Sequence, residues 1–311
     1  MINYEVVLAS GQIVQANTKI NHDLFIALKG GSNNFGIVTR FDLPTFVQGQ
    51  MWGGDIFYSA SAVPQIFQAF NDFAATTSPD EQAHVIAATS WSNGTETGVS
   101  SIYHATPIVA PPSLKPFTLI EPQIFSSLRF NSLLGFAEEQ SAFSTDGARQ
   151  LYFTTCFRLD AQFMFDVREL WLQTLKTIDT VEGLVLTLVF QPLTKGLLSK
   201  SAALTGNSLG LSPGDGPLVI TLFNSVHINA LDDNKVIAAV LALIENIDTL
   251  AAQKGLSARY RFTNYGYKTQ KILEGYGDES LENLRAASKK YDPQGFFQSV
   301  VPGGFKLSQV P

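Results

Sequence analysis

The sequence predicts an α+β protein built around a large antiparallel sheet flanked by helices. Several strand-like segments are separated by too few residues for the crossover that parallel strands need. Three amphipathic segments, at 63–73, 164–178 and 236–247, carry apolar residues at helical spacing. The chain has 311 residues, of which 45% are hydrophobic and 15% are charged, so it is long enough to bury a sizeable core.

The first elements follow from local patterns. Residues 3–16 alternate around Gly11, which predicts a two-stranded hairpin with a tight turn. Asn21 is expected to cap a short helix that ends at Gly30 and Gly31. A strand is then expected at 37–46, a helix at 63–73, and strands at 84–91, 101–106 and 117–121.

The second half shows stronger periodicity. Residues 151–159 alternate, so Tyr152 and Arg158 are expected on one face of a strand. Asp278 is expected to cap the last helix, which Pro293 ends. Between them we expect a helix at 164–178, a strand at 183–193, a mobile glycine-rich loop at 195–217, a strand at 218–228, a helix from 233 and a strand at 259–265.

Composition excludes several classes of partner. The net charge is −6 and no basic stripe with interleaved aromatics occurs, so nucleic acid is not expected as a partner. Charged residues interrupt the longest apolar stretch, at 236–251, so a membrane span is not expected either.

The first residues lack a basic and apolar leader, which predicts no signal peptide on this chain and leaves its location open. Cys156 is the single cysteine, and no spacing of metal-ligating residues suggests a metal site.

Four short segments are informative when they are taken together. They are NYEVVLASG at 3–11, GGSNNFGIVT at 30–39, FTNY at 262–265 and KYDPQGFF at 290–297. Each segment alone is modest, but their order and spacing are specific and extend from one end of the chain to the other. Together they resemble the berberine bridge enzyme-like family of FAD-linked oxidases, which has a PCMH-type FAD-binding domain. A fifth segment, at 190–193, resembles the fungal members of this family.

The resemblance implies two modules. Residues 1–50 and 268–311 would be the remnant second lobe of the FAD-binding domain, and 51–267 the substrate-binding domain, whose sheet lies over the flavin. Family members carry an upstream lobe with a histidine that attaches FAD covalently. None of the four histidines here matches that motif, so we expect the N-terminal flavin lobe and a covalent attachment site to be missing. FAD is thus the cofactor by resemblance, with its binding weakened or lost.

The resemblance also implies where FAD contacts fall. Glycine has no Cβ, so the backbone can pass close to a flat ligand, and an amide can both donate to and accept from a heterocycle edge. The alternative is that the same glycines serve a helix end and a tight turn, and that the later asparagine is a turn residue. The residues concerned are Asn34, Gly36, Ile37, Val38, Asn264 and Tyr265.

Polar residues on the predicted strands are the candidates for catalysis. One face of an antiparallel sheet can line a cavity when helices cover the other. The alternative is a solvated face. Histidine, at position 227, is the one residue type among these candidates that can change its charge near neutral pH. The candidates are Tyr152, Arg158, Gln191, Asn224 and His227.

Two hydrolase-like patterns carry less weight. Gly206–Gly210 spells G-x-S-x-G, but no helix is expected after it, as a nucleophile elbow requires. Ser225 and His227 lie close to Asp232 in sequence, without evident oxyanion donors.

Three functions remain open. The first is a truncated FAD-linked oxidoreductase-like protein that acts on a small molecule in secondary metabolism. The second is a flavin-independent cyclase, such as a Diels–Alderase-like pericyclase, in which a pocket orients a reactive substrate. The third is a ligand-binding pseudoenzyme. An apolar face left by the missing lobe would favour a homodimer.

Overall fold

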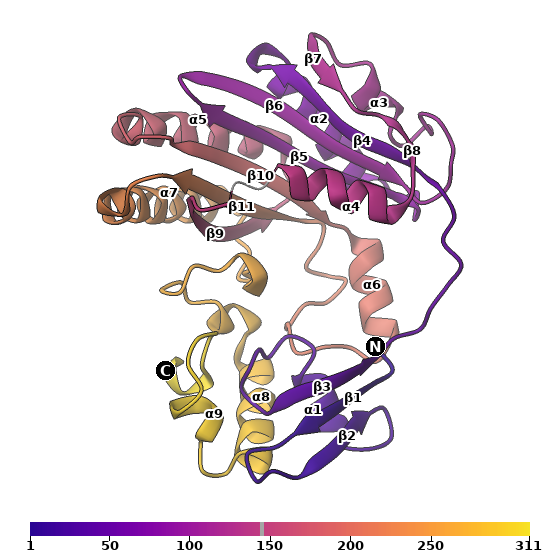
Figure 1. Cartoon of the computed structure of the whole chain (residues 1–311), viewed down its shortest axis with the longest axis vertical. Coiled ribbons are helices and arrows are strands. Elements are labelled where there is room, and N and C mark those ends of the chain that lie inside the picture. The colour runs from indigo at the N-terminus through magenta and orange to yellow at the C-terminus, as the bar shows by residue number, and fades with distance from the viewer. Residues whose placement is uncertain (144–145) are drawn as a thin grey trace. The chain divides into compact units, whose positions relative to one another are not determined.

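A computed structural model describes residues 1–143 and 146–311 and divides the chain into two compact units (Figure 1). The terminal unit comprises residues 1–47, 195–215 and 259–311, and the sheet unit comprises residues 48–194 and 216–258. Residues 195–215 and 259–267 therefore group with the terminal unit, whereas the sequence placed them in the substrate-binding domain. The assignment of the units to flavin and substrate stays a prediction.

An eight-stranded antiparallel sheet forms the centre of the sheet unit, which confirms the predicted fold class. Its order is β7-β4-β6-β5-β10-β11-β9, and β8 also pairs with β4. The strands are β4 (Met51–Ser59), β5 (Ala83–Ser92), β6 (Thr95–His104), β7 (Gln123–Ser126), β8 (Arg129–Asn131), β9 (Arg149–Arg158), β10 (Val185–Leu193) and β11 (Leu218–His227).

Three long helices lie on one face of this sheet: α2 (Val63–Ala75), α5 (Ala161–Ile178) and α7 (Asp233–Gln253) (Figure 1). Asp160 caps α5 by accepting a hydrogen bond from the Phe163 amide at 2.7 Å. Arg168 of α5 donates to Glu96 of β6, with 2.7 Å between Nε and Oε1, and both side chains are largely buried. A buried ion pair of this kind resists separation, because either partner alone would be an uncompensated charge.

Residues 230–253 form a helical run of 24 residues that is long and apolar enough to cross a membrane, contrary to our expectation from the sequence. This test uses length and composition only, and a helix that covers a sheet passes it too. Helix α7 contacts both α5 and β9. Its buried residues are Val236, Val240, Leu243, Ile244, Ile247 and Ala251, all at helical spacing. One side of α7 is thus packed within the sheet unit.

The terminal unit contains a three-stranded antiparallel sheet of order β2-β1-β3. The predicted hairpin is confirmed, with β1 (Asn3–Val7) and β2 (Ile13–Asn17) joined by a turn in which Gly11 has φ +81°. Strand β3 (Ile37–Asp42) pairs with the other side of β1. The helices of this unit are α1 (His22–Ala27), α6 (Lys195–Ala203), α8 (Asp278–Tyr291) and α9 (Phe296–Ser299).

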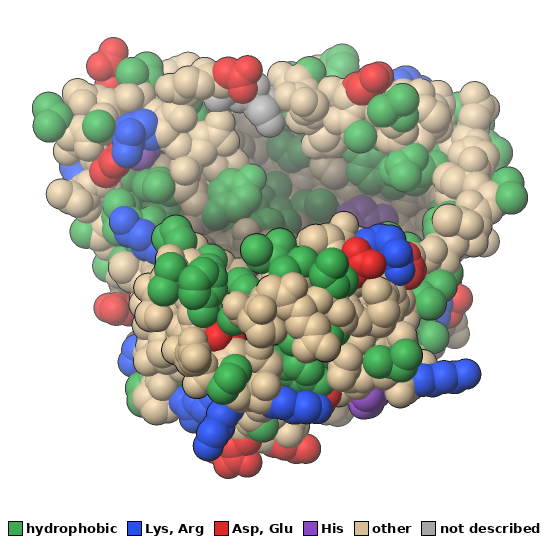
Figure 2. All heavy atoms as spheres, turned by 60° about the horizontal axis from the view of Figure 1, so that its bottom comes forward, with side chains coloured by type: hydrophobic (Ala, Val, Ile, Leu, Met, Phe, Trp, Pro, Cys, Tyr) green, Lys and Arg blue, Asp and Glu red, His purple; other side chains and the backbone are tan. Residues whose placement is uncertain are grey.

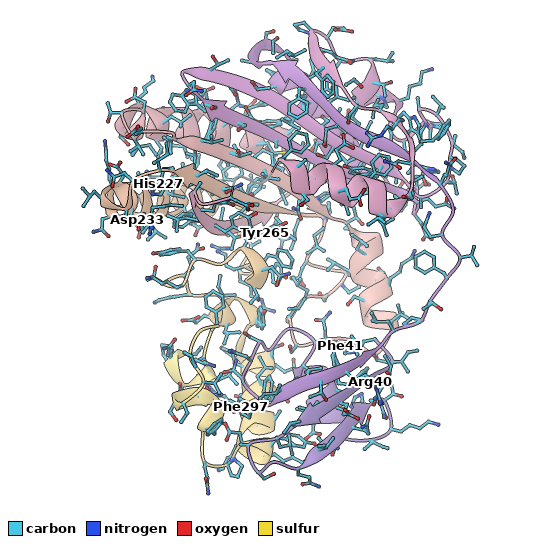
Figure 3. The ribbon with its side chains drawn as sticks, in the orientation of Figure 1. Arg40, Phe41, His227, Asp233, Tyr265 and Phe297 are labelled. Atoms are coloured by element: carbon cyan, nitrogen blue, oxygen red, sulfur yellow. The ribbon has the colours of Figure 1, made fainter. Side chains whose placement is uncertain are left out.

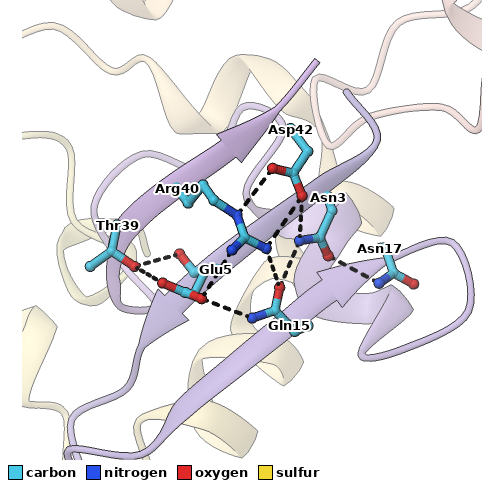
Figure 4. A network of polar contacts seen from close by, with 7 residues as sticks. All are labelled: Asn3, Glu5, Gln15, Asn17, Thr39, Arg40 and Asp42. Carbon is cyan, nitrogen blue, oxygen red and sulfur yellow. Dashed lines mark hydrogen bonds and ion pairs between the residues drawn. The ribbon is translucent and has the colours of Figure 1, made fainter. Parts of the chain in front are cut away.

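The two faces of this small sheet differ in chemistry. The buried Tyr4 packs its ring against that of Phe25 on α1, with 5.8 Å between the ring centroids. The opposite face carries a network in which Arg40 bridges the three strands (Figure 4). Hydrogen bonds from Thr39 and Gln15 lower the pKa of Glu5, so the carboxylate stays charged beside Arg40. The network comprises Asn3, Glu5, Gln15, Asn17, Thr39, Arg40 and Asp42.

Hydrophobic side chains are also exposed on the surface of the molecule (Figure 2). In the terminal unit, Ile37 and Phe41 of β3 are 59% and 58% exposed. Phe46, in the segment that follows β3, is 81% exposed. Apolar groups at an edge strand are a common basis for association, but the homodimer expected from the sequence stays a prediction.

Several predicted elements are wrong. Residues 117–121 do not form a strand, because α3 (Lys115–Thr118) begins there with Pro116 in its first turn. Residues 195–203 form α6 rather than a loop, since leucine, lysine and alanine favour helix despite Gly196 and the neighbouring serines. Residues 259–265 contain no strand and end in the 3₁₀ turn η3 (Thr263–Tyr265).

Two predicted helix caps also differ. Asn21 is at the cap position of α1, but its side chain donates to the Gln15 carbonyl at 2.8 Å instead of capping the helix. Gly277 is at the cap position of α8, so Asp278 is the first residue of the helix and not its cap. No side chain makes a capping hydrogen bond at this end of α8. A carboxylate there still complements the helix dipole.

Sequence patterns did not predict β4 or the helix α4 (Leu133–Ala142). Gly53 and Gly54 interrupt β4 and both have positive φ, which disguises the strand. A Cβ at Gly53 would clash with the carbonyl oxygen of Ile102 in the neighbouring strand. Glycine is therefore required there by the close approach of β6.

Asn34 is fully buried and joins the two ends of the terminal unit. Its Nδ2 donates to the carbonyl oxygens of Gly31 at 2.8 Å and Phe305 at 2.9 Å. Its Oδ1 accepts from the Leu307 amide at 3.2 Å and from Gln298 at 3.0 Å. Because both side-chain polar atoms are used within the fold, the side chain of Asn34 has a structural role, and any contact with FAD would have to come from its backbone.

We expect Asn34→Ala to lower the free energy of unfolding by about 2–4 kcal/mol, because several buried partners lose their hydrogen bonds. Urea unfolding followed by circular dichroism measures this change. Asn283→Ala, on the exposed side of α8 in the same unit, is the matched control and is expected to shift stability by less than about 0.5 kcal/mol. Equal midpoints for the two variants would contradict the structural role of Asn34.

Candidate functional site

A cavity of about 600 Å³ lies within the terminal unit. Its walls come from the end of α1, from α6 and the loop after it, and from the segment that starts at 260. The walls are mainly apolar, with a few polar groups between them, as in most small-molecule sites. The lining includes Lys29, Gly30, Leu204, Leu209, Phe262 and Asn264.

Asn264 lies on the wall of this cavity, in the turn η3. Its side chain is exposed there and makes no hydrogen bond to any residue that the structure describes. Tyr276 holds the turn in place, because its hydroxyl pairs with that of Thr263 and donates to the Gly30 carbonyl at 3.0 Å. The donors and the acceptor of the Asn264 amide are thus available to a ligand on a turn that the fold fixes.

Tyr265, the next predicted site residue, has an aromatic neighbour within the same segment (Figure 3). Its ring packs edge-on against that of Phe262, with 4.9 Å between the ring centroids. Phe262 lines the cavity, whereas Tyr265 does not. The ring of Tyr265 therefore supports the cavity wall, and its predicted contact with FAD stays a prediction.

The glycine-rich segment has reasons within the fold for its composition. A Cβ at Gly36 would lie 2.5 Å from Val6 Cγ1 and 2.9 Å from the Val7 carbonyl oxygen, so β1 and β3 approach too closely for a side chain. Ile37 and Val38 belong to β3 and pair with β1. Among the described residues, those that line the cavity do not include Gly36, Ile37 or Val38. Their predicted contact with FAD stays a prediction.

The second candidate site is the face of the large sheet opposite α2, α5 and α7. Strand register places Thr187 directly opposite Ser90 and Asn224, and Asn224 directly opposite Tyr152. The Ser90 and Thr187 hydroxyls are 2.8 Å apart, and Tyr152 is 41% exposed. Asn224 Oδ1 is buried without a hydrogen-bond partner among the described residues. The structure thus brings two predicted site residues, Tyr152 and Asn224, into one polar row that crosses four strands.

Two other predicted residues share this face away from the polar row. Gln191 is opposite Ile220, which is opposite Cys156. Arg158 is at the end of β9 and is exposed. As the alternation predicted, Tyr152 and Arg158 lie on the same face of β9, at positions separated by an even number of residues.

His227 lies on the other face of the sheet and does not line an open surface. It is fully buried, and its Nε2 is 2.9 Å from Asp233 Oδ1 at the start of α7 (Figure 3). Arg149 donates to both oxygens of Asp233, and these contacts with Arg149 and His227 lower the Asp233 pKa to about 2. His227 therefore joins β11 to α7 through Nε2, whereas its Nδ1 is buried without a hydrogen-bond partner among the described residues, and its predicted catalytic role stays a prediction.

A third polar group that the sequence did not reveal lies where α4 packs on β4 and β6. Gln140 of α4 donates from Nε2 to Asp55 Oδ2 at 2.6 Å and to the Tyr103 hydroxyl at 3.0 Å. Burial raises the pKa of Asp55, which is 2% exposed. Burial also raises the pKa of Tyr103 to about 12. The only sequence signal was an aspartate within an otherwise apolar segment, and the glycines before it concealed the strand.

The residues present fit a flavin edge better than a metal ion. The Asn264 amide on an apolar wall suits a heterocycle that offers both donors and acceptors. Gly30, with φ +125°, also lines the cavity, but the close approach of Leu209 Cδ2, 2.5 Å from where a Cβ would lie, explains this glycine within the fold. Among the residues that the structure describes, no three His, Cys, Asp or Glu side chains group closely enough to hold a metal.

No protein-family model matches the sequence. The chain is 34% identical over 318 residues to the FAD-dependent monooxygenase tpcD of Cochliobolus heterostrophus, and the match covers 98% of this chain and 61% of that protein. It is 33% identical to the FAD-dependent monooxygenase drtC of Aspergillus calidoustus, with 100% and 60% covered. It is also 32% identical to the FAD-dependent monooxygenase CTB5 of Cercospora nicotianae, with 99% and 69% covered. The chain thus spans about 60% of the length of the first two relatives.

Solved structures share the fold at lower sequence identity. 6-Hydroxy-D-nicotine oxidase from Arthrobacter nicotinovorans superposes with a TM-score of 0.71 at 15% identity, over 96% of this chain and 64% of that one. A variant of berberine bridge enzyme gives a TM-score of 0.71 at 12% identity, over 100% and 66%. Since the relatives and the fold agree, the chain belongs to the berberine bridge enzyme-like family of FAD-linked oxidases, of the type found in fungi.

Proposed function

We propose that this chain forms part of an FAD-linked oxidoreductase that acts on a small molecule in secondary metabolism. The observation that carries the proposal is the Asn264 amide, which is exposed on an apolar cavity wall and is not used by any described residue of the fold. An amide placed in this way gives a largely apolar site its orientation and specificity. Family membership supports flavin as the ligand.

The two units would bind different ligands, the flavin and the substrate. In the terminal unit, Asn264 would bind the edge of the flavin ring, and Tyr260 and Phe262 would supply apolar contact. When bound, the flavin would supply the chemistry of accepting a hydride. In the sheet unit, the face of the large sheet opposite the long helices would bind the substrate through the polar row that includes Tyr152 and Asn224. The buried, unpartnered Oδ1 of Asn224 supports this assignment, because such an atom is normally satisfied in a folded protein.

Tyr103 and Asp55 give the sheet unit two buried or half-buried groups whose pKa is raised, and only Tyr103 has a pKa far above neutral pH. With its pKa raised to about 12, Tyr103 keeps its proton on Oη at neutral pH and acts as a donor. Asp55 is a poor anion in its buried position, and Gln140 orients it from α4. Such a pair would position a carbonyl or hydroxyl oxygen of a substrate, and it would serve equally in the flavin-independent cyclisation considered above.

Flavin binding tests the proposal directly. We expect the 311-residue chain to bind FAD and Asn264→Ala to bind it about tenfold more weakly, because the loss of one or two hydrogen bonds has an effect of this size. Quenching of flavin fluorescence on titration with protein measures the affinity, and Asn283→Ala is the control. No flavin binding by the unmodified chain would defeat the proposal and leave cyclisation as the remaining enzymatic hypothesis.

Asp55 gives a pH-dependent prediction. Its pKa is raised by burial in the folded state, so it stabilises the fold below the ordinary aspartate pKa of about 4, and this contribution is lost as pH rises through the folded pKa. We therefore expect Asp55→Asn to gain stability relative to the unmodified chain between pH about 3 and about 7. Urea midpoints at both pH values measure the difference. A difference between the two proteins that does not change with pH would show that Asp55 ionises normally.

A further inference from the structure

Lys29 is a cation without a counter-charge in the wall of the cavity. It follows α1, and its ammonium group donates to the neutral hydroxyl of Thr205 at 2.8 Å. The same nitrogen lies 4.2 Å from the centroid of the Phe25 ring. No carboxylate among the described residues pairs with it, and burial lowers its pKa. Lys29 is also the only charged side chain among the described residues that line the cavity.

The loop after α6 holds the backbone of Lys29 as well as its side chain. The Ser208 amide and hydroxyl donate to the Lys29 carbonyl oxygen at 3.1 and 3.0 Å. Asn207 donates from Nδ2 to the Ser201 hydroxyl at 2.7 Å, which fixes the same loop to α6. The backbone of Lys29 is therefore fixed by the fold, and its ammonium group has the Thr205 hydroxyl as its hydrogen-bond partner.

The backbone of Thr205 is strained. Its φ is +88°, in the region that favours glycine, although threonine is β-branched. Such a conformation persists only where the surrounding structure enforces it, and it is common at sites that clamp ligands. Here it places the Thr205 hydroxyl against the Lys29 ammonium group, which leaves the other donors of that group for a ligand.

The rest of the cavity favours an apolar ligand with one negative charge. Leu204, Leu209 and Phe262 contribute apolar wall. One lysine balances a single charge, whereas a phosphate carries nearly two, and lysine meets a phosphate only as a point charge and not in the bidentate way of arginine. A carboxylate matches one ammonium group in both charge and hydrogen bonding.

We propose that this cavity binds an aromatic or aliphatic carboxylic acid, with its carboxylate on Lys29 and its apolar body against Leu204, Leu209 and Phe262. The proposal goes beyond the proposed function, since it names a second ligand of the cavity that Asn264 also lines, in addition to the flavin edge and separate from the substrate on the large sheet. Binding of the acid itself does not require the flavin.

The test uses the 311-residue chain without added flavin and two probes of nearly equal shape, 2-naphthoate and the neutral 2-naphthamide. Isothermal titration calorimetry measures both affinities. We expect the carboxylate to bind at least about tenfold more tightly, as a charge-assisted hydrogen bond would give. Lys29→Met should abolish this preference, and Lys29→Arg should restore part of it.

Lys19→Met is the matched control, because Lys19 is exposed in the same unit and does not line the cavity. Thermal melting of each variant shows that it is folded. Equal affinity for the two probes, binding of neither, or a preference that survives in Lys29→Met would overturn the proposal. So would stronger competition by inorganic pyrophosphate than by benzoate, because Lys29 would then be a phosphate ligand.

The outcomes also separate this proposal from the proposed function. A chain that prefers naphthoate but does not bind FAD would keep the carboxylate site and reject the flavin site. A chain that binds FAD through Asn264 but shows no preference for the carboxylate would keep the flavin site and reject the carboxylate site.

Discussion

The buried side chain of Asn34 is the constraint on which the terminal unit depends. It connects the turn after α1 to the last residues of the chain through hydrogen bonds to Gly31, Phe305 and Leu307. Asn34 and Phe305 are 271 residues apart in sequence, so one side chain closes a unit made from both ends of the chain. The cavity belongs to this unit, so its walls depend on the same connection.

The large sheet separates structure from chemistry by its two faces. On the face covered by α2, α5 and α7, Arg168 pairs with Glu96 and His227 Nε2 with Asp233, whereas Thr221 Oγ1, Ser225 Oγ and His227 Nδ1 are buried without a partner among the described residues. The opposite face carries the polar row with Tyr152 and Asn224. Antiparallel register aligns such rows across strands, so a sheet can present several donors and acceptors to one ligand without any catalytic motif in the sequence.

Local patterns predicted the fold class, the hairpin and the faces of β9, because these depend on alternation and short connections. They did not predict the site contacts, which join distant residues. Asp55 and Gln140 are 85 residues apart, and Lys29 and Thr205 are 176 apart. Neither pair has a spacing that a sequence reveals. The position of His227 beside Asp233 at the start of α7 is likewise not evident from its residue type.

Some residues of the predicted FAD site are accounted for by contacts within the fold, and others are not. Gly36 is explained by the approach of Val6, and Asn34 is fully paired, so neither requires a ligand. The Asn264 amide makes no hydrogen bond to a described residue, and the Lys29 ammonium group has the Thr205 hydroxyl and the Phe25 ring as neighbours but no carboxylate among the described residues. The two groups are therefore best explained by a ligand that pairs with them.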